Sequence, residues 1–151
     1  YGVNAPFYNM EDGSVMTVFR YKEQHQSYPG RVHGGMITAM LDEMGLRSLW
    51  AKELSEETFG VTISLDTKYR KPVPYETELI GRGVVVKNTS HFIITDSYIM
   101  DKDGEILANG RIKYIKMDTQ KIQEGVEVHE EMPYLVEDGR TEIEGPFFDN
   151  L

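Results

Sequence analysis

One long helical segment, followed by four strand-like segments, most constrains what this chain can fold into. Between residues 34 and 54 apolar side chains recur with helical spacing and share one arc at about 100° per residue. The arc consists of Met36, Ile37, Met40, Leu41, Met44 and Ser48. This is the only long helical pattern in the sequence, so the core is expected to form around a single helix.

The segments around this helix have the β-branched and aromatic content of strands. The expected strands are residues 15–21, 61–69, 76–86, 91–100 and 105–116, with turns at 87–89 and 101–104. The order of one strand, a long helix and four successive strands predicts an α+β fold, in which an antiparallel sheet packs on the central helix.

The strand expected at residues 61–69 alternates between two sets of side chains. One set is Val61, Ile63, Leu65, Thr67 and Tyr69, and the other is Thr62, Ser64, Asp66, Lys68 and Arg70. The alternation therefore predicts that Thr62 lies on the polar side of this strand, which Pro72 and Pro74 end.

Length and composition exclude several classes of protein. With 151 residues, of which 40% are apolar and 27% charged, the chain fits one globular domain. A net charge of −9 argues against nucleic-acid binding. The absence of cysteine excludes disulfides, thiolate metal sites and a cysteine nucleophile. No apolar run suits a membrane span or a secretory signal, so a cytoplasmic location is expected.

The acidity is concentrated at the C-terminal end. The net charge is −3 over residues 1–60, +2 over residues 61–116 and −8 over residues 117–151. We therefore expect one domain over residues 1–117 and an acidic extension of unknown role over residues 118–151. The extension is predicted to pack outside the domain or at an oligomer interface, with partial disorder as the alternative. Its apolar contacts would come from Tyr134, Leu135, Phe147 and Phe148.

The start of the helix is the first candidate site. His33 precedes Gly34 and Gly35, which leave backbone N–H groups without a side chain to obstruct a ligand. Such a helix start suits a developing oxyanion. The alternative is that the two glycines only allow a tight turn or a close contact between helix and sheet.

A stripe of small residues on the helix is the second candidate site. Opposite the apolar arc lie Gly35, Thr38, Ala39, Asp42 and Gly45. An ordinary solvent-exposed face carries longer polar side chains, so this stripe predicts close packing against a ligand or a partner subunit. Asp42 could then act as a base or nucleophile. A plain solvated aspartate is the alternative, and Glu43 is the rival carboxylate.

The usual motifs of other enzyme classes are absent. His25, His91 and His129 are scattered without the spacing of a metal site, so no metal is expected. The sequence contains no GxSxG elbow, P-loop or GxGxxG fingerprint.

Over residues 15–116 the sequence resembles the hotdog-fold acyl-CoA thioesterases of the PaaI-like branch. The resemblance is carried by the His33-Gly34-Gly35 triplet, by Asp42 nine positions after the histidine, and by residues 62–69 running into Arg70-Lys71-Pro72. It implies a sheet wrapped around the helix and an active site built across a homodimer, either alone or in a dimer of dimers. It implies hydrolysis of a CoA thioester without metal or cofactor.

The resemblance also implies roles for individual residues. Asp42 would be the general base or nucleophile, and the Gly35 amide would polarise the thioester carbonyl. His33 would orient the loop or help hold that carbonyl, and Thr62 would position the water or intermediate. The implied substrate contacts are Gly34 beside the carbonyl, Lys68, Arg70 and Lys71 near the CoA phosphates, and Asn88, Thr89 and Ser90 along the pantetheine.

One position departs from the family's pattern. Many members carry an asparagine six residues before the motif histidine, where this chain has Ser27 beside His25 and Gln26. The same pocket could instead belong to a non-catalytic acyl-CoA binding or sensing module, or to a hotdog dehydratase or hydratase. The sequence does not identify the acyl group.

Overall fold

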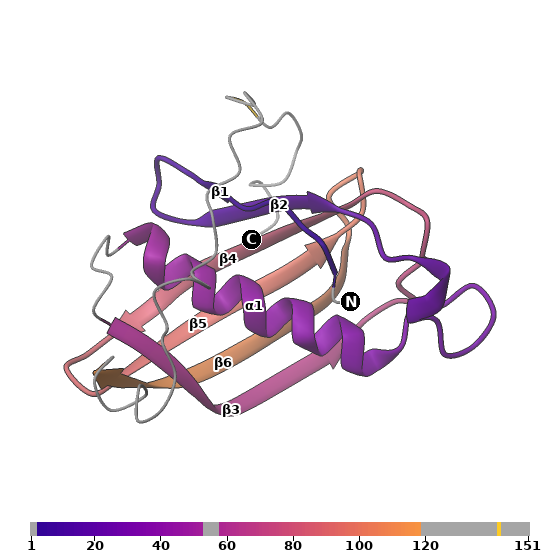
Figure 1. The fold of residues 1–151 in the computed structure, drawn as a ribbon. Helices are drawn as coiled ribbons and strands as arrows, with labels where there is room; N and C mark the ends of the chain where they lie inside the picture. The colour runs from indigo at the N-terminus through magenta and orange to yellow at the C-terminus, as the bar shows by residue number, and fades with distance from the viewer. Residues whose placement is uncertain (1–2, 53–57, 119–141, 143–151) are drawn as a thin grey trace.

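The computed structural model describes residues 3–52, 58–118 and 142 of the chain (Figure 1). Within these residues six strands and one long helix form. In chain order the elements are β1 (Tyr8–Asn9), β2 (Val15–Phe19), a short 3₁₀ helix (Glu23–His25), α1 (Gly34–Lys52), β3 (Thr58–Tyr69), β4 (Leu79–Asn88), β5 (Phe92–Met100) and β6 (Ile106–Asp118).

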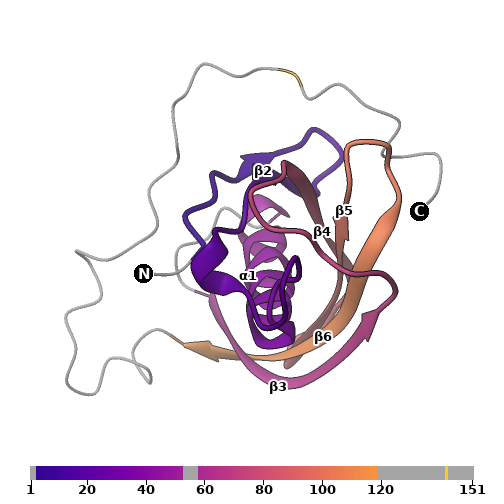
Figure 2. The same ribbon diagram turned by 90° about the vertical axis from the view of Figure 1, so that its right-hand side faces the viewer.

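The six strands form one antiparallel sheet in the order β1-β2-β4-β5-β6-β3. Helix α1 lies across one face of this sheet (Figure 1), and a view turned by 90° shows the sheet curving around the helix (Figure 2). This arrangement confirms the predicted α+β class and the hotdog architecture.

The core lies between α1 and the concave face of the sheet. Met40, Leu41 and Met44 are buried there against strand residues such as Phe19 and Leu79. Ser48 is also buried, so the predicted arc does face the sheet. Met36, at the edge of the arc, is only half-buried.

Glycines allow a very close approach of helix and sheet. A Cβ atom on Gly83 of β4 would lie 2.3 Å from the carbonyl oxygen of Met44. On the helix side, a Cβ atom on Gly45 would lie 2.4 Å from the Tyr114 hydroxyl and 2.5 Å from Thr95 Oγ1. Gly45 therefore faces the sheet, which corrects its assignment to the small-residue stripe on the open side.

Several strand boundaries differ from the prediction. β1 was not expected; it pairs with β2 across a turn in which Gly13 has φ 78° and the Ser14 amide donates to Asp12 Oδ1 at 2.9 Å. β4 continues through Asn88, into the predicted turn at residues 87–89, because a bulge between Val85 and Lys87 lets the ladder with β5 continue.

A second bulge determines which way Thr62 points. β3 is an edge strand whose register against β6 shifts between Thr62 and Ser64. Thr62 pairs with Tyr114, which is buried under the helix, so Thr62 lies on the helix-facing side, as do Leu65 and Tyr69 farther along. The prediction that Thr62 is on the opposite side from Leu65 was wrong, because simple alternation does not allow for an inserted residue.

None of the helices in the described residues is long and apolar enough to span a membrane. The acidic extension over residues 118–151, including its four apolar candidates, lies outside the described residues except for Asp118 at the end of β6 and Glu142.

Candidate active site

The Asp42 carboxylate is held by a hydroxyl group from the edge strand. Thr62 Oγ1 donates to Asp42 Oδ1 at 2.9 Å and lies 3.2 Å from Oδ2. Asp42 is half-buried on the face of α1 that the sheet leaves open, and Thr62 is exposed. The bond uses one acceptor position of the carboxylate and leaves the others for a water molecule or a substrate.

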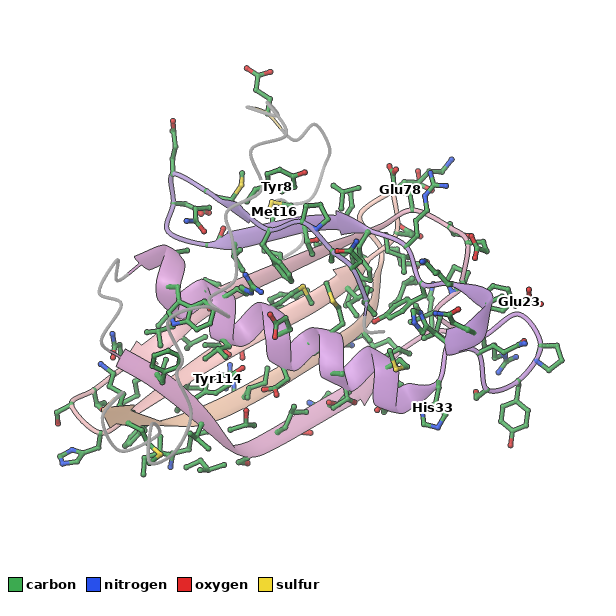
Figure 3. All side chains as sticks on the ribbon, viewed as in Figure 1. Tyr8, Met16, Glu23, His33, Glu78 and Tyr114 are labelled. Atoms are coloured by element: carbon green, nitrogen blue, oxygen red, sulfur yellow. The ribbon has the colours of Figure 1, made fainter. Side chains whose placement is uncertain are left out.

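Tyr114 supports the same turn of the helix from below. Its hydroxyl donates to the backbone carbonyl of Asp42 at 2.7 Å, and Figure 3 shows Tyr114 on the sheet beneath α1. Burial raises the pKa of Tyr114, and the Asp42 carboxylate acts in the same direction. The phenol therefore stays protonated and remains a hydrogen-bond donor to Asp42 at neutral pH.

The helix start is capped by an imidazole. His33 Nδ1 accepts a hydrogen bond from the Gly35 amide at 2.9 Å, and the His33 carbonyl accepts the amides of Met36 and Ile37. His33 thus acts as an N-cap. Because Nδ1 is the acceptor, the neutral ring carries its hydrogen on Nε2, and the exposed side chain (Figure 3) presents that donor outward.

Tyr69 is a residue of this site to which the sequence analysis assigned no role. From the end of β3 its hydroxyl donates to the Gly34 carbonyl at 3.1 Å and lies 2.7 Å from Thr38 Oγ1. The alternation along the expected strand places Tyr69 on the same side as Leu65, which was the one indication in the sequence that it faces the helix. No sequence pattern shows which backbone group a tyrosine hydroxyl reaches.

Two other candidates are engaged elsewhere. Glu43, the rival carboxylate, forms an ion pair with Arg47 at 2.7 Å. Ser27 is exposed, while its neighbour His25 is buried and accepts the Lys22 amide at 3.1 Å. Of the two carboxylates on α1, Asp42 is therefore the one placed beside a hydroxyl donor on the open face of the helix.

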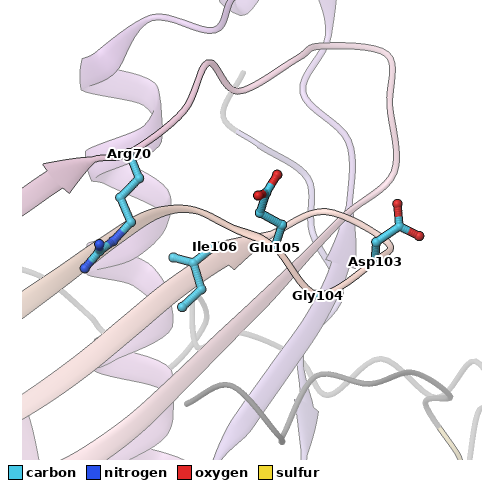
Figure 4. Close-up of a pocket in the computed structure, with 5 residues that line it drawn as sticks. All are labelled: Arg70, Asp103, Gly104, Glu105 and Ile106. Carbon is cyan, nitrogen blue, oxygen red and sulfur yellow. The ribbon is translucent and has the colours of Figure 1, made fainter.

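The basic residues predicted near the CoA phosphates lie at the end of β3 and just beyond it. Arg70 lines a cavity of 440 Å³ together with residues 103–106 (Figure 4) and donates to Asn109 Oδ1 at 2.6 Å. Lys71 forms an ion pair with Glu105, and Lys68 is exposed. Acidic side chains therefore neutralise part of the charge expected for phosphate binding.

The predicted pantetheine contacts lie at the other end of the sheet. Asn88 is the last residue of β4, and Thr89 and Ser90 belong to the connection to β5. Phe92, at the start of β5, pairs with Ile115 of β6, which also pairs with Val61 near the start of β3. The basic residues follow about eight positions later on β3, which corresponds to about 25 Å. One chain does not bring these two groups together.

Gly35 and Asp42 are also separated. They lie seven positions apart on α1, which places them about 10 Å apart along the helix axis. A carbonyl oxygen bound by the Gly35 amide is thus beyond direct reach of the carboxylate on the same helix.

In the described part of the chain no three His, Asp or Glu side chains are placed to hold a metal ion.

Comparison with known proteins places these observations in a family context. The family model described as "Thioesterase superfamily" matches residues 29–108. Human acyl-coenzyme A thioesterase 13 is 23% identical over 100 residues, which cover 66% of this chain and 70% of the human protein. The rat acyl-coenzyme A thioesterase THEM4 is 25% identical over 118 residues; they cover 78% of this chain but only 49% of the rat protein.

Solved structures agree on the fold. A thioesterase from Haemophilus influenzae superposes with a TM-score of 0.69 at 12% identity, and the match covers 77% of this chain and 80% of that one.

Proposed function

The chain belongs to the thioesterase superfamily, and we propose that it hydrolyses an acyl-CoA to the free acid and CoA by carboxylate catalysis. Support comes from the family match and from the two relatives named as acyl-coenzyme A thioesterases. The observation that carries the mechanism is the Asp42 carboxylate held by Thr62 on the open face of α1.

In this mechanism Asp42 acts as a general base. The carboxylate takes a proton from a water molecule as the water oxygen attacks the thioester carbon. The carbonyl oxygen becomes an oxyanion, which the Gly35 amide stabilises after the substrate displaces His33 Nδ1. The carbon–sulfur bond then breaks, the proton passes from Asp42 to the leaving thiolate, and the carboxylate is regenerated.

The separation of about 10 Å along the helix favours an active site shared by two copies of the chain. Gly35 of one copy would act with Asp42 of the other. The edge strand β3 provides a surface for this pairing, because its apolar residues Val61 and Ile63 are 41% and 54% exposed. Antiparallel pairing centred near Leu65 would bring Thr62 of one copy opposite Tyr69 of the other.

The same pairing would bring the two groups of CoA contacts to one end of the joint sheet. The start of β3 in one copy would lie beside the end of β3 in the other, so Lys68, Arg70 and Lys71 would share that end with the partner's Asn88, Thr89 and Ser90. CoA would then lie across the two subunits. We place the enzyme in the cytoplasm, which the absence of cysteine suits.

A thiol-release assay with a panel of short, medium, long and aromatic acyl-CoAs tests this function. Asp42→Asn should lower kcat by at least about 100-fold, because general bases contribute about 10²- to 10⁴-fold, and it should leave the fold intact. Asp12→Asn is the matched control, since Asp12 is an exposed carboxylate in the turn between β1 and β2, at the opposite edge of the sheet from β3. Saturable binding of every ester without hydrolysis would instead support a sensing module, and an undiminished rate in Asp42→Asn would remove that residue from the mechanism.

A further inference from the structure

We propose that Tyr69 is a positioning residue that polarises the peptide unit between Gly34 and Gly35 and so strengthens the amide that binds the oxyanion. This inference rests on the proposed function and extends it to a residue that does not touch the reacting atoms. The observation behind it is that the Tyr69 hydroxyl donates to the Gly34 carbonyl oxygen at 3.1 Å.

The direction of each hydrogen bond follows from the number of hydrogens. A phenol has one hydrogen, and Tyr69 uses it on the Gly34 carbonyl. The 2.7 Å contact between Thr38 Oγ1 and the Tyr69 hydroxyl must then be donated by Thr38. Thr38 Oγ1 also has a single hydrogen, and the other acceptor within its reach, Thr67 Oγ1, lies farther away at 3.4 Å, so the hydrogen goes to the Tyr69 hydroxyl. A short chain of bonds therefore runs from Thr38 through Tyr69 to Gly34.

This series of hydrogen bonds ends at the peptide unit whose N–H binds the oxyanion in the proposed mechanism. The Gly34 carbonyl and the Gly35 N–H belong to the same planar peptide unit. A hydrogen bond accepted by the carbonyl oxygen draws electron density from the nitrogen, so the N–H becomes a stronger donor; such cooperative strengthening is about 10–30% per bond. The same bond also anchors the first turn of α1 to β3 and thereby fixes the direction in which the N–H points.

Side chains pack tightly against both glycines. A Cβ atom on Gly34 would lie 3.3 Å from the Tyr69 hydroxyl, and a Cβ atom on Gly35 would lie 3.0 Å from His33 Nδ1. The first glycine thus makes room for Tyr69 at the carbonyl end of the peptide unit. The second makes room for the imidazole, or for a substrate in its place, at the N–H end.

Tyr69→Phe removes the hydrogen bond and keeps the ring, which is 54% exposed. Loss of an oxyanion donor costs about 10²- to 10³-fold, so a weakening of 10–30% predicts a fall in kcat of about two- to eightfold. KM should change less than twofold, because the effect is on the transition state. Thr38→Val should give a smaller fall, and Thr38→Ser, which keeps the hydroxyl, should behave like the wild type.

The matched control is Tyr28→Phe, which makes the same chemical change at a tyrosine that is 74% exposed in the loop before the helix. Both variants are compared with the wild type in activity and by NMR. The sequence contains a single Gly-Gly dipeptide, so protein labelled with glycine carrying carbonyl ¹³C and ¹⁵N gives one HNCO signal, which links the Gly34 carbonyl to the Gly35 amide.

The proposal predicts that Tyr69→Phe moves both the carbonyl carbon and the amide proton of this signal upfield, with the fall in kcat, while Tyr28→Phe changes neither. Shifts no larger than those of Tyr28→Phe, or shifts without a change in kcat, would overturn it. If the wild type hydrolyses no acyl-CoA, the proposed function fails, and the HNCO signal still decides whether Tyr69 polarises this peptide unit.

Discussion

At the scale of single residues, the site depends on how the Asp42 carboxylate is oriented. Thr62 bonds it from β3, and Tyr114 bonds the backbone of the same residue from β6. Two elements of the sheet therefore determine the position of one helical side chain. A general base must lie within hydrogen-bond reach of the proton that it removes, so in the proposed mechanism this support affects the rate.

Thr62→Val should separate orientation from packing, because valine keeps the shape and loses the hydroxyl. A hydrogen bond to a charged group is worth about 1.5–3 kcal/mol, and the exposure of Thr62 favours the lower end. We expect kcat to fall about tenfold. Thr62→Ser should keep most of the activity, and Ser64→Ala, on the other side of the bulge, should have no effect. Equal activity of the valine and serine variants would show that the bond does not orient Asp42.

Asp42 could be selected from the sequence, but its contact with Thr62 could not. The small residues around Asp42 and its offset from His33 mark the position, whereas alternation along β3 turns Thr62 away from the helix. The bulge after Thr62 reverses that direction. A bulge adds one residue without a composition signal of its own, so a sequence pattern with period two misses it.

At the scale of elements, the contact between α1 and β4 is unusually close. Gly81 and Gly83 on β4 face Met44, and at Gly83 the nearest helix atom is a backbone carbonyl oxygen. A side-chain neighbour can rotate away from an added methyl group, whereas a helix carbonyl cannot move without shifting the whole helix. These glycines therefore determine the distance between α1 and β4. The same distance determines how far Asp42 lies from the sheet.

Gly83→Ala should lower the free energy of unfolding by about 1–3 kcal/mol, the usual cost of overpacking a core. Gly110→Ala on β6 is the matched control, since its added Cβ atom would lie no closer than 3.5 Å to any neighbour. Urea unfolding monitored by circular dichroism measures both variants. If the two glycines prove equally tolerant, α1 does not approach β4 as closely as the structure shows.

Tyr114 links β6 to α1, and its raised pKa predicts a pH dependence of stability. An acid whose pKa is higher in the folded state contributes stability that is complete below its unfolded pKa of about 10 and is lost as the pH rises above it. The loss is at most about 1.4 kcal/mol at one unit above that value. Tyr114→Phe should therefore lose less stability than the wild type between pH 8 and pH 11, and Tyr28→Phe should lose as much as the wild type. Urea midpoints at the two pH values decide this, and an equal loss in all three proteins would contradict it.

The elements themselves could largely be predicted from periodicity, because α1 has one buried arc and the later strands follow turn signals. β1 was missed because two residues are too short for a pattern, although Asp12-Gly13 is a hairpin signal. The prediction that Gly45 lies on the open face of the helix was also wrong. On a helix packed this closely, glycine marks contact with the sheet as readily as an open side, and the sequence does not distinguish the two.

At the scale of the whole molecule, a single chain separates groups that the proposed reaction must combine. Gly35 and Asp42 lie about 10 Å apart along one helix, and the two groups of residues predicted to contact CoA lie at opposite ends of the sheet. Both separations would be closed by one antiparallel pairing of β3 with a second copy. A sequence pattern does not give distances between elements. The need for a second copy of the chain could therefore be inferred only from the three-dimensional structure.

A heterodimer of two inactive variants provides the test. One chain carries Asp42→Asn, and the other carries Gly35→Pro, which removes the amide hydrogen in the first turn of α1, where proline is best tolerated in a helix. Each variant alone should be inactive. If Gly35 of one copy acts with Asp42 of the other, the heterodimer contains one site with both groups intact and one with neither.

Two different affinity tags isolate the heterodimer, and thiol release measures its activity. The shared site predicts about half of the wild-type activity per dimer, because one of the two sites works fully. A site built within a single chain predicts almost none, since every chain then lacks one of the two groups. Recovery of both tags in one species shows that the variants fold and associate, so an inactive heterodimer would count against the shared site.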